Sequence, residues 1–153
     1  IFSAQNFVCA FFNLDVFFTA VIIDIDTNTG LLTYSSAGHP AQLLIHDGNV
    51  IKLALEGKLL GLSLGTKFDY TSFEIGKNDK LLLFSDGLLE EFNKEQEEFG
   101  EKILPDLSEE NKNLDINTLM NKILTELYQF IKDTEVNDDI TVIGVELFEN
   151  DNT

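Results

Sequence analysis

The strongest periodic pattern in the chain lies near its C-terminal end, between residues 115 and 132. Apolar residues recur there at helical spacing, so they would share one face of an α-helix. Asp115 stands directly before the pattern, where a carboxylate can accept hydrogen bonds from the first backbone N–H groups of a helix. The apolar positions are Ile116, Leu119, Met120, Ile123, Leu124, Leu127, Phe130 and Ile131. The segment therefore predicts an amphipathic helix.

Runs of β-branched and aromatic residues, separated by turn residues, occupy much of the remaining chain. Asp-Thr-Asn-Thr-Gly at 26–30 and the pair Asp47-Gly48 interrupt such runs with residues that favour tight turns, so each predicts a β-hairpin. The predicted strands cover residues 17–25, 31–38, 67–75, 80–85 and 140–148, and two more lie within the hairpin 41–53. Because hairpin strands pair antiparallel and the helices fall mostly late in the chain, the pattern predicts an α+β fold with a largely antiparallel sheet.

Other segments give weaker patterns. Residues 1–14 are mostly apolar and predict a short helix. Residues 54–66 are rich in glycine and residues 90–102 are acidic, so both predict irregular loops. Pro105 would break a helix that begins near Gly100, because proline lacks the backbone N–H and its ring clashes with the preceding turn. That helix is therefore expected to be short or kinked.

Composition places the chain among globular proteins and narrows its partners. The 153 residues are 44% hydrophobic and 24% charged, which suffices for one domain with a buried core. The net charge of -17 argues against nucleic acid and against an anionic membrane surface, since both attract basic surfaces. No apolar run is long enough to span a bilayer. The single cysteine, Cys9, allows no internal disulfide, and its apolar neighbours favour a small buried side chain.

The chain begins with Ile1, and its one methionine is Met120, so we interpret it as part of a longer protein. We expect one partial domain over residues 1–148 and a frayed tail over residues 149–153. No signal peptide is visible, although a preceding segment could carry one, or a membrane sensor.

Three aspartates stand at strand ends that could meet. Asp86 follows the predicted strand 80–85, and Asp138 and Asp139 precede the predicted strand 140–148. If these strands are antiparallel neighbours, the carboxylates reach the same end of the sheet, where their repulsion favours a shared cation. Mg²⁺ and Mn²⁺ suit carboxylate and water ligands. Ser-Asp-Gly and Asn-Asp-Asp are also common in turns and loops, so the residues alone leave a turn and a metal site as alternatives.

The two histidines give little evidence of catalysis. His39 precedes Pro40 in a tight connection and predicts a structural turn, and His46 lies beside the Asp47-Gly48 turn, where we expect it to be exposed. Two histidines and one cysteine do not favour a zinc site. No serine stands in the Gly-x-Ser-x-Gly elbow of hydrolases, and no glycine-rich loop has the Lys-Ser/Thr ending of a P-loop.

Several motifs occur in an order that changes the balance between a turn and a metal site. Ala-Gly-His-Pro at 37–40 is followed by Ser-Asp-Gly-Leu-Leu-Glu at 85–90 and Asp-Asp-Ile-Thr at 138–141. In this order and context the motifs resemble the C-terminal part of the bacterial metal-dependent serine/threonine phosphatases of the PPM type, which are similar to protein phosphatase 2C. The branch that the chain resembles is the SpoIIE-type branch of sporulation and stress signalling. The resemblance runs from about Phe17 to Leu147.

The resemblance implies a β-sandwich flanked by helices, in an α-β-β-α arrangement that holds Mn²⁺ or Mg²⁺ at one end. In that family the metals activate a water that attacks a phosphoserine or phosphothreonine directly, without a covalent enzyme intermediate. By this resemblance Asp86 and Asp138 are metal ligands. Gly87 is the glycine that allows the backbone to approach the site, and Asp139 supports the ligands. No side chain, His39 included, is expected to act in catalysis beyond the metal-bound water.

Two motifs of that family are absent from this chain: an early Gly-Asp, and an Asp-x-x-Gly-His/Lys-Gly that would supply the remaining carboxylate ligands. We therefore expect the chain to bind a divalent ion weakly and to show little or no turnover, because ligand number and charge set the affinity. The N-terminal strands and first helix of the family would also be missing. Their absence should expose apolar surface and a sheet edge, and favour self-association.

For the complete protein the resemblance implies a phosphorylated protein substrate on a bacterial signalling pathway, such as an anti-anti-sigma factor. It also implies a cytoplasmic location and an upstream sensor domain, which could anchor the protein in a membrane. The alternative is a phosphatase-like module that binds a partner and has lost the chemistry.

Overall fold

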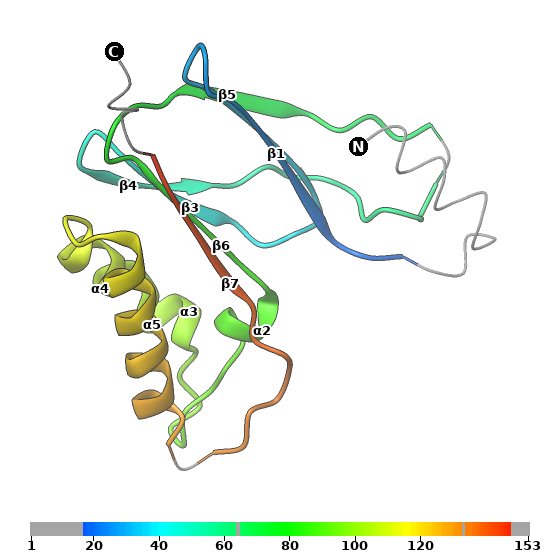
Figure 1. Cartoon of the computed structure of the whole chain (residues 1–153). Helices are drawn as coiled ribbons and strands as arrows, with labels where there is room; N and C mark the ends of the chain where they lie inside the picture. The colour runs from blue at the N-terminus through cyan, green and yellow to red at the C-terminus, as the bar shows by residue number, and fades with distance from the viewer. Residues whose placement is uncertain (1–16, 64, 133, 148–153) are drawn as a thin grey trace. The chain divides into compact units, whose positions relative to one another are not determined.

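The computed structural model describes residues 17–63, 65–132 and 134–147, and the chain forms two compact units (Figure 1). Unit 1 comprises Ile1–Ala41 and Leu53–Ile75, and unit 2 comprises Gln42–Lys52 and Gly76–Thr153. The helix predicted for residues 1–14, the environment of Cys9 and the tail 149–153 lie outside the described residues.

The sheet of unit 1 has three antiparallel strands in the order β1-β2-β5. These strands are β1 (Ala20–Asp26), β2 (Leu31–Ala37) and β5 (Tyr70–Glu74). The hairpin predicted around residues 26–30 is confirmed: Asp26 Oδ1 accepts a hydrogen bond from Asn28 N at 2.9 Å, and Gly30 has a φ of 69°. The same bond holds the pKa of the Asp26 carboxyl below its usual value.

The sheet of unit 2 has the strand order β4-β3-β6-β7. Its strands are β3 (Gln42–His46), β4 (Asn49–Leu53), β6 (Lys80–Phe84) and β7 (Val142–Glu146). Asp47 and Gly48 join β3 to β4 with φ angles of 49° and 72°, as a two-residue hairpin turn requires. Strand β6 pairs antiparallel with both β3 and β7.

Four helices are present in the described part of the chain, all in unit 2. They are α2 (Asp86–Leu89), α3 (Phe99–Lys102), α4 (Leu104–Asn111) and α5 (Ile116–Phe130). Pro105 lies in the first turn of α4, where the missing N–H costs little, so it begins a helix after the short α3 has ended. The loop predicted over residues 90–102 is wrong at its end, where α3 forms. None of the described helices is long and apolar enough to cross a membrane.

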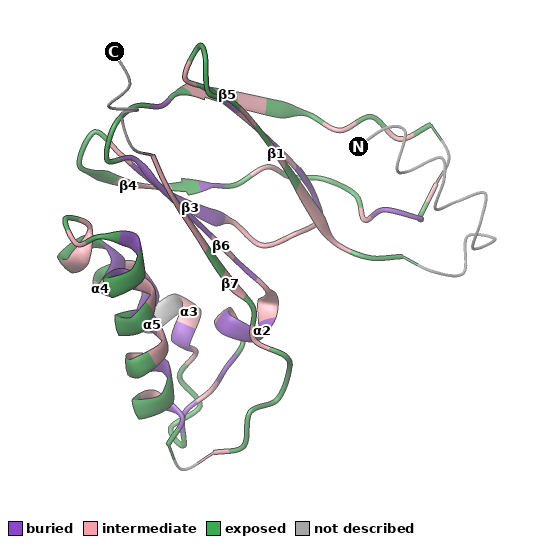
Figure 2. Ribbon diagram, in the orientation of Figure 1, coloured by how far each residue is buried: buried purple, intermediate pink, exposed green. Residues whose placement is uncertain are grey.

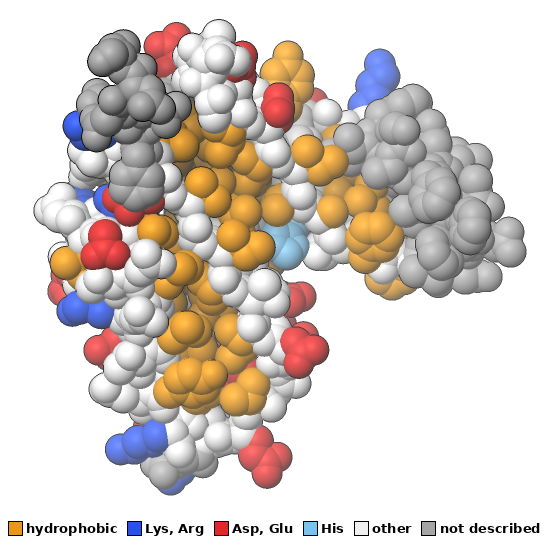
Figure 3. Space-filling model, viewed as in Figure 1, with side chains coloured by type: hydrophobic (Ala, Val, Ile, Leu, Met, Phe, Trp, Pro, Cys, Tyr) orange, Lys and Arg blue, Asp and Glu red, His pale blue; other side chains and the backbone are white. Residues whose placement is uncertain are grey.

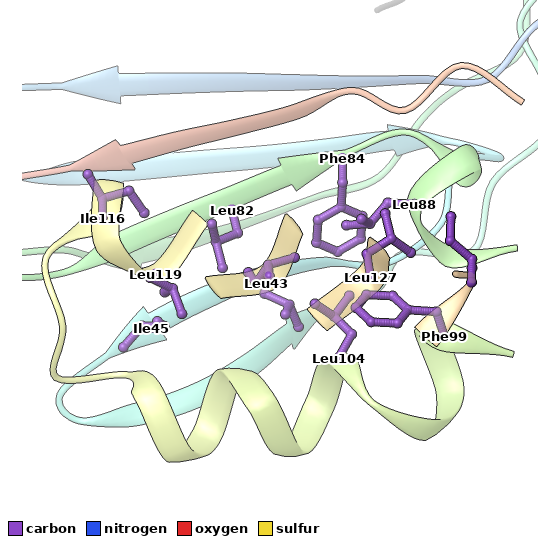
Figure 4. Packing of buried hydrophobic residues seen from close by; sticks show 12 residues of the cluster. Leu43, Ile45, Leu82, Phe84, Leu88, Phe99, Leu104, Ile116, Leu119 and Leu127 are labelled. Atoms are coloured by element: carbon purple, nitrogen blue, oxygen red, sulfur yellow. The ribbon is translucent and has the colours of Figure 1, made fainter. Parts of the chain in front are cut away.

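The core of unit 2 lies between its sheet and its helices (Figure 4). Alternate residues of β3 and β6 contribute to it, and α5 contributes the apolar stripe that its periodicity predicts. Figure 2 shows buried and exposed positions along the same helix. The buried cluster consists of Leu43, Ile45, Leu82, Phe84, Leu88, Phe99, Leu104, Ile116, Leu119, Ile123, Leu127 and Ile131. Gly144 of β7 allows α5 to pack closely, since a Cβ atom at this position would stand 2.6 Å from Met120 Sδ.

Polar contacts fix the beginning of α5. Asp115 caps the helix as predicted, because its Oδ1 accepts a hydrogen bond from Thr118 N at 3.0 Å. Ile116 N donates to Glu146 Oε2 at 2.9 Å, which joins the first residue of α5 to the last residue of β7. Glu146 also faces the buried ammonium of Lys80, at an Nζ–Oε1 distance of 3.6 Å.

Unit 1 exposes several large apolar side chains. Figure 3 shows that apolar side chains also reach the surface in the middle of the face in view, with most charged side chains around them. The exposed residues of unit 1 are Phe17, Phe18, Ile22, Leu31, Leu62 and Tyr70. Within the described residues β1 forms a ladder with β2 alone, so its other side is a sheet edge. These features agree with the expected apolar surface, whereas self-association stays a prediction.

Candidate metal-binding site

The register of β6 and β7 brings the predicted aspartates to one end of the sheet in unit 2. The strands are antiparallel, and Phe84, the last residue of β6, pairs with Val142, the first residue of β7. Asp86 lies just after Phe84 in the chain, and Asp138 lies just before Val142. The segments that carry the two aspartates therefore leave the sheet at the same end. The antiparallel pairing that the sequence argument required is therefore confirmed. The roles of the aspartates as ligands stay predictions.

Ser85 joins the segment that follows β6 to the segment that precedes β7, just beyond the paired residues of these strands. Its backbone N–H donates to Thr141 O at 3.0 Å, and its Oγ accepts from Thr141 N at 3.0 Å. The same hydroxyl donates to Asp139 O at 3.1 Å. Three hydrogen bonds from one residue thus hold the segment that carries Asp138 and Asp139 beside the start of α2.

Gly87 lies against the backbone of the Asp138-Asp139 segment. A Cβ atom at residue 87 would stand 2.5 Å from Asp139 O and 3.0 Å from Asp139 C, whereas ordinary contacts begin at 3.4 Å. A side chain therefore cannot be accommodated here unless the backbone moves. The close backbone approach that the sequence suggested for Gly87 is present, and it sets how near the Asp-Gly motif comes to the second pair of aspartates.

The carboxylates of this region are oriented by neighbouring backbone groups. Asp86 Oδ1 accepts from Gly87 N at 3.1 Å, and Asp138 Oδ1 accepts from Asp139 N at 2.7 Å. Asp86 is half-buried, and Asp138 and Asp139 are exposed. In the described residues these three side chains do not form a set whose ligand atoms all lie within 4.8 Å of one another. Their oxygen donors fit Mg²⁺ or Mn²⁺ as part of a ligand set rather than as a complete one.

Two buried polar side chains that the sequence reasoning missed hold the same region. Gln42 replaces a backbone partner at the end of β6: its Oε1 accepts from Phe84 N at 2.7 Å, and its Nε2 donates to Phe84 O at 3.3 Å. Glu91 Oε1 accepts from Asn137 N at 2.9 Å, one residue before Asp138. Gln42, the first residue of an apolar strand, gave a weak signal as a polar residue in a buried run. Glu91 gave none, because it lies in a run of acidic residues.

A second group of potential ligands lies at the opposite end of β6, beside its first residue. His46 Nδ1 is 2.8 Å from Asp79 Oδ2, and His46 Nε2 is 3.5 Å from Asp47 Oδ2. In the part of the chain that the structure describes, this is the one set of three possible ligand side chains within 4.8 Å. The Asp79 carboxylate also accepts from Gly76 N at 2.8 Å and Asp47 N at 3.3 Å, so it joins two neighbouring turns.

The environment of His46 differs from the sequence expectation. The hydrogen bond with Asp79 raises the pKa of His46 above its usual value. The side chain is 23% exposed and bonded, so the prediction of an exposed histidine is wrong. Its partner lies 33 residues away in sequence, where no local pattern could reveal it.

His39 has the structural setting that its motif predicted. It follows Gly38, which has a φ of 63° just after β2 ends. His39 Nδ1 is 2.8 Å from Thr19 Oγ1, and its carbonyl oxygen accepts from Ser36 Oγ at 3.3 Å. These contacts support a turn-stabilising role within unit 1.

Solved phosphatase structures share this fold. The chain is similar to the Mn-presoaked phosphatase domain of the cell fate determinant SpoIIE from Bacillus subtilis, with a TM-score of 0.68 and 16% identity over 88% of this chain and 59% of that one. It is similar to the SiaA-PP2C domain of Pseudomonas aeruginosa, with a TM-score of 0.81 and 15% identity over 94% of this chain and 57% of that one. It is also similar to the RsbU and RsbW domains of Rv1364c from Mycobacterium tuberculosis, with a TM-score of 0.68 and 26% identity over 84% of this chain and 35% of that one.

Two antiparallel sheets with helices in this arrangement define a PP2C-type phosphatase fold, and the predicted α+β class is confirmed. Stage II sporulation protein E (SpoIIE) is the family whose sequence pattern matches residues 2–148, so the chain belongs to the SpoIIE family. The fold is partial, because the chain spans less than two thirds of the length of each solved relative described above. No match is found among curated proteins.

Proposed function

We propose that this chain is the C-terminal, metal-binding part of a metal-dependent protein serine/threonine phosphatase domain. The complete enzyme would hydrolyse phosphoserine or phosphothreonine on a bacterial regulator such as an anti-anti-sigma factor. One observation carries the proposal: in a member of the SpoIIE family, Gly87 lies against the carbonyl of Asp139. This contact brings the Asp-Gly motif after β6 and the aspartate pair before β7 to the same place.

Asp86 and Asp138 are the proposed ligands of Mn²⁺ or Mg²⁺, and Gly87 and Asp139 support them. A bound divalent ion would offset the charge of the phosphate and favour ionisation of a water. The protein supplies the placement of the ligands. Ser85 holds the Asp139 carbonyl, and the antiparallel pair β6–β7 carries both aspartates to one end of the sheet. Without a cation the carboxylates would repel a phosphorylated substrate.

The proposed substrate also indicates the cellular compartment of the reaction. A regulator of bacterial sigma factors acts in the cytoplasm, so we place the proposed activity there, under the control of an upstream sensor domain. Among the described strands β1 pairs on one side with β2 alone, and this sheet edge supports self-association of the chain through edge-to-edge pairing.

Titration of Mn²⁺ into the chain, followed by electron paramagnetic resonance, tests the ligands. Wild type should bind Mn²⁺ weakly, and Asp86→Asn and Asp138→Asn should each weaken binding by about tenfold or more, because each removes a charged ligand. Asp47→Asn is the matched control, since Asp47 is the aspartate of the other Asp-Gly pair of the chain. Loss of binding in Asp47→Asn alone would instead place the ion at His46, Asp47 and Asp79.

Hydrolysis of a phosphopeptide by the complete protein tests the activity. Asp86→Asn should abolish the metal-dependent reaction while the circular dichroism spectrum stays unchanged. The chain of residues 1–153 alone should show little or no turnover, and robust Mn²⁺-dependent hydrolysis by it would contradict the incomplete ligand set. A complete protein that binds its partner but never hydrolyses it, with or without Mn²⁺, would favour the non-catalytic module.

A further inference from the structure

Glu91 is a fully buried carboxylate in the connection that follows α2. Its Oε1 accepts from Asn137 N at 2.9 Å, and its Oε2 is buried without a hydrogen-bond partner in the described residues. Burying a carboxylate with one oxygen unpaired costs free energy that an apolar side chain of similar size would not cost. Packing alone therefore does not explain an acid here, and the contact with Asn137 offers a reason.

The contact lies in the connection between α5 and β7, which carries the aspartate pair. Residues of the segment 85–92 hold this connection at successive points. Thr134 Oγ1 donates to Phe92 O at 3.1 Å, and Asn137 N donates to Glu91 Oε1 at 2.9 Å. Ser85 Oγ then donates to Asp139 O at 3.1 Å. Asp138 therefore stands between two fixed neighbours, one held by Glu91 and the other by Ser85.

These neighbours matter because the Asp138 side chain contributes little to its own placement. It is exposed, and within the described residues its hydrogen bond goes to the adjacent Asp139 N–H. The backbone on either side must then determine where the carboxylate lies. With Ser85 alone, the segment before Asp138 could pivot about Asp139. The bond to Asn137 removes that freedom, and an acidic acceptor makes it stronger than a neutral one.

We propose that Glu91 is a positioning residue for the metal site: its buried carboxylate holds the backbone N–H of Asn137 and so places the Asp138 carboxylate relative to Asp86. The inference rests on the proposed function, in which Asp86 and Asp138 bind the metal. Glu91 itself need not touch the ion.

Mn²⁺ titrations of three variants of the chain test this role. Glu91→Leu removes the acceptor at similar size and should weaken Mn²⁺ binding about tenfold, as loss of an outer partner of a metal ligand typically does. Glu91→Gln keeps a neutral, weaker acceptor for Asn137 N–H, so its affinity should lie between those of wild type and Glu91→Leu. Glu97→Leu is the control, since Glu97 accepts from Asn93 Nδ2 at 2.9 Å in the same connection and should leave the affinity unchanged.

Amide hydrogen exchange gives a readout that needs no metal. The Asn137 amide should be protected in the wild-type chain, unprotected in Glu91→Leu and protected again in Glu91→Gln. The Phe99 amide is an internal reference, because it donates to the backbone carbonyl of Glu91 at 2.9 Å and should stay protected in every variant. If Glu91→Leu fails to fold, the exchange rate of the Asn137 amide in the wild-type chain still tests the contact. Unprotected exchange at this amide would refute the hydrogen bond to Glu91.

The outcomes separate the two proposals. A wild-type chain that binds Mn²⁺, together with a folded Glu91→Leu that binds it equally well, overturns the role of Glu91 and leaves the proposed function standing. A wild-type chain whose Mn²⁺ binding does not depend on Asp86 and Asp138 overturns the proposed site and this inference with it.

Discussion

Replacement of Gly87 by alanine tests the contact on which the proposed site depends. The added Cβ atom would stand 2.5 Å from Asp139 O, 3.0 Å from Asp139 C and 3.5 Å from Asp138 C. These are backbone atoms, which cannot rotate aside as a side chain can. To restore an ordinary contact of 3.4 Å to the carbonyl oxygen, the two segments must separate by about 0.9 Å, the difference between 3.4 and 2.5 Å.

The cost of this separation follows from the contacts that it disturbs. Forcing a methyl group into a packed site costs about 1–3 kcal/mol. The hydrogen bond from Ser85 Oγ to Asp139 O, now 3.1 Å long, lies directly across the gap, and its loss adds about 1 kcal/mol. A loss of 1 kcal/mol lowers the melting temperature of a domain of this size by about 2–4 °C, so Gly87→Ala should melt several degrees below wild type.

Thermal unfolding followed by circular dichroism measures the stability, and Mn²⁺ titration of the same samples measures the site. Gly76→Ala is a matched control in the same unit, because a Cβ atom at Gly76 would meet nothing within 4 Å. It should leave the affinity for Mn²⁺ unchanged and keep or slightly raise the melting temperature. If Gly87→Ala behaved like Gly76→Ala in both measurements, the reasoning from the close approach would be refuted.

Three further substitutions test other contacts of unit 2. Gly144→Ala should lower the free energy of unfolding in urea by about 1–3 kcal/mol, because the methyl group of the alanine would collide with α5. An unchanged urea midpoint would mean that the helix can shift to make room. Gln42→Leu should lower the free energy of unfolding by about 1–3 kcal/mol. It should also speed hydrogen exchange at the Phe84 amide, which loses its side-chain partner. Unchanged protection of this amide would contradict the role of Gln42 as its acceptor. Because Asp79 raises the pKa of His46 above 6.5, their pairing stabilises the fold fully below pH 6.5 and is lost as the pH rises through the folded pKa. His46→Gln should therefore lower the melting temperature more at about pH 5.5 than at about pH 9, and equal losses at both would refute the pairing.

The features that the sequence predicted well are those with a local cause. Asp47-Gly48 predicted a hairpin because both residues tolerate positive φ, and both adopt it. The apolar stripe after Asp115 predicted α5 because its repeat matches the helical period over several turns. The prediction that Asp86 lies near the Asp138 segment needed one assumption, that the two neighbouring strands pair antiparallel. Strands β6 and β7 do so.

The features that the sequence did not reveal depend on partners distant along the chain. Glu91 contacts Asn137, and His46 contacts Asp79. Because the partners are far apart in the sequence, neither contact produces a periodic pattern that could predict it. The helices α2 and α3 are one turn long, too short for a hydrophobic period to appear. The glycines of the Asp86 and Asp47 dipeptides have different surroundings: backbone atoms of Asp139 lie against Gly87, whereas a Cβ atom at Gly48 would meet nothing within 4 Å.

The bond between Ile116 N and Glu146 Oε2 closes a ring in the chain, since it joins residues 30 positions apart at 2.9 Å. Helix α5, the connection that carries Asp138 and strand β7 all lie inside this ring. Detaching the Glu146 end would also separate this carboxylate from the buried Lys80 ammonium, which opposes fraying of that end. The ring is therefore expected to open and close as one cooperative unit. The order of the Asp138 segment would then depend on this junction as well as on its own bonds to Ser85 and Glu91.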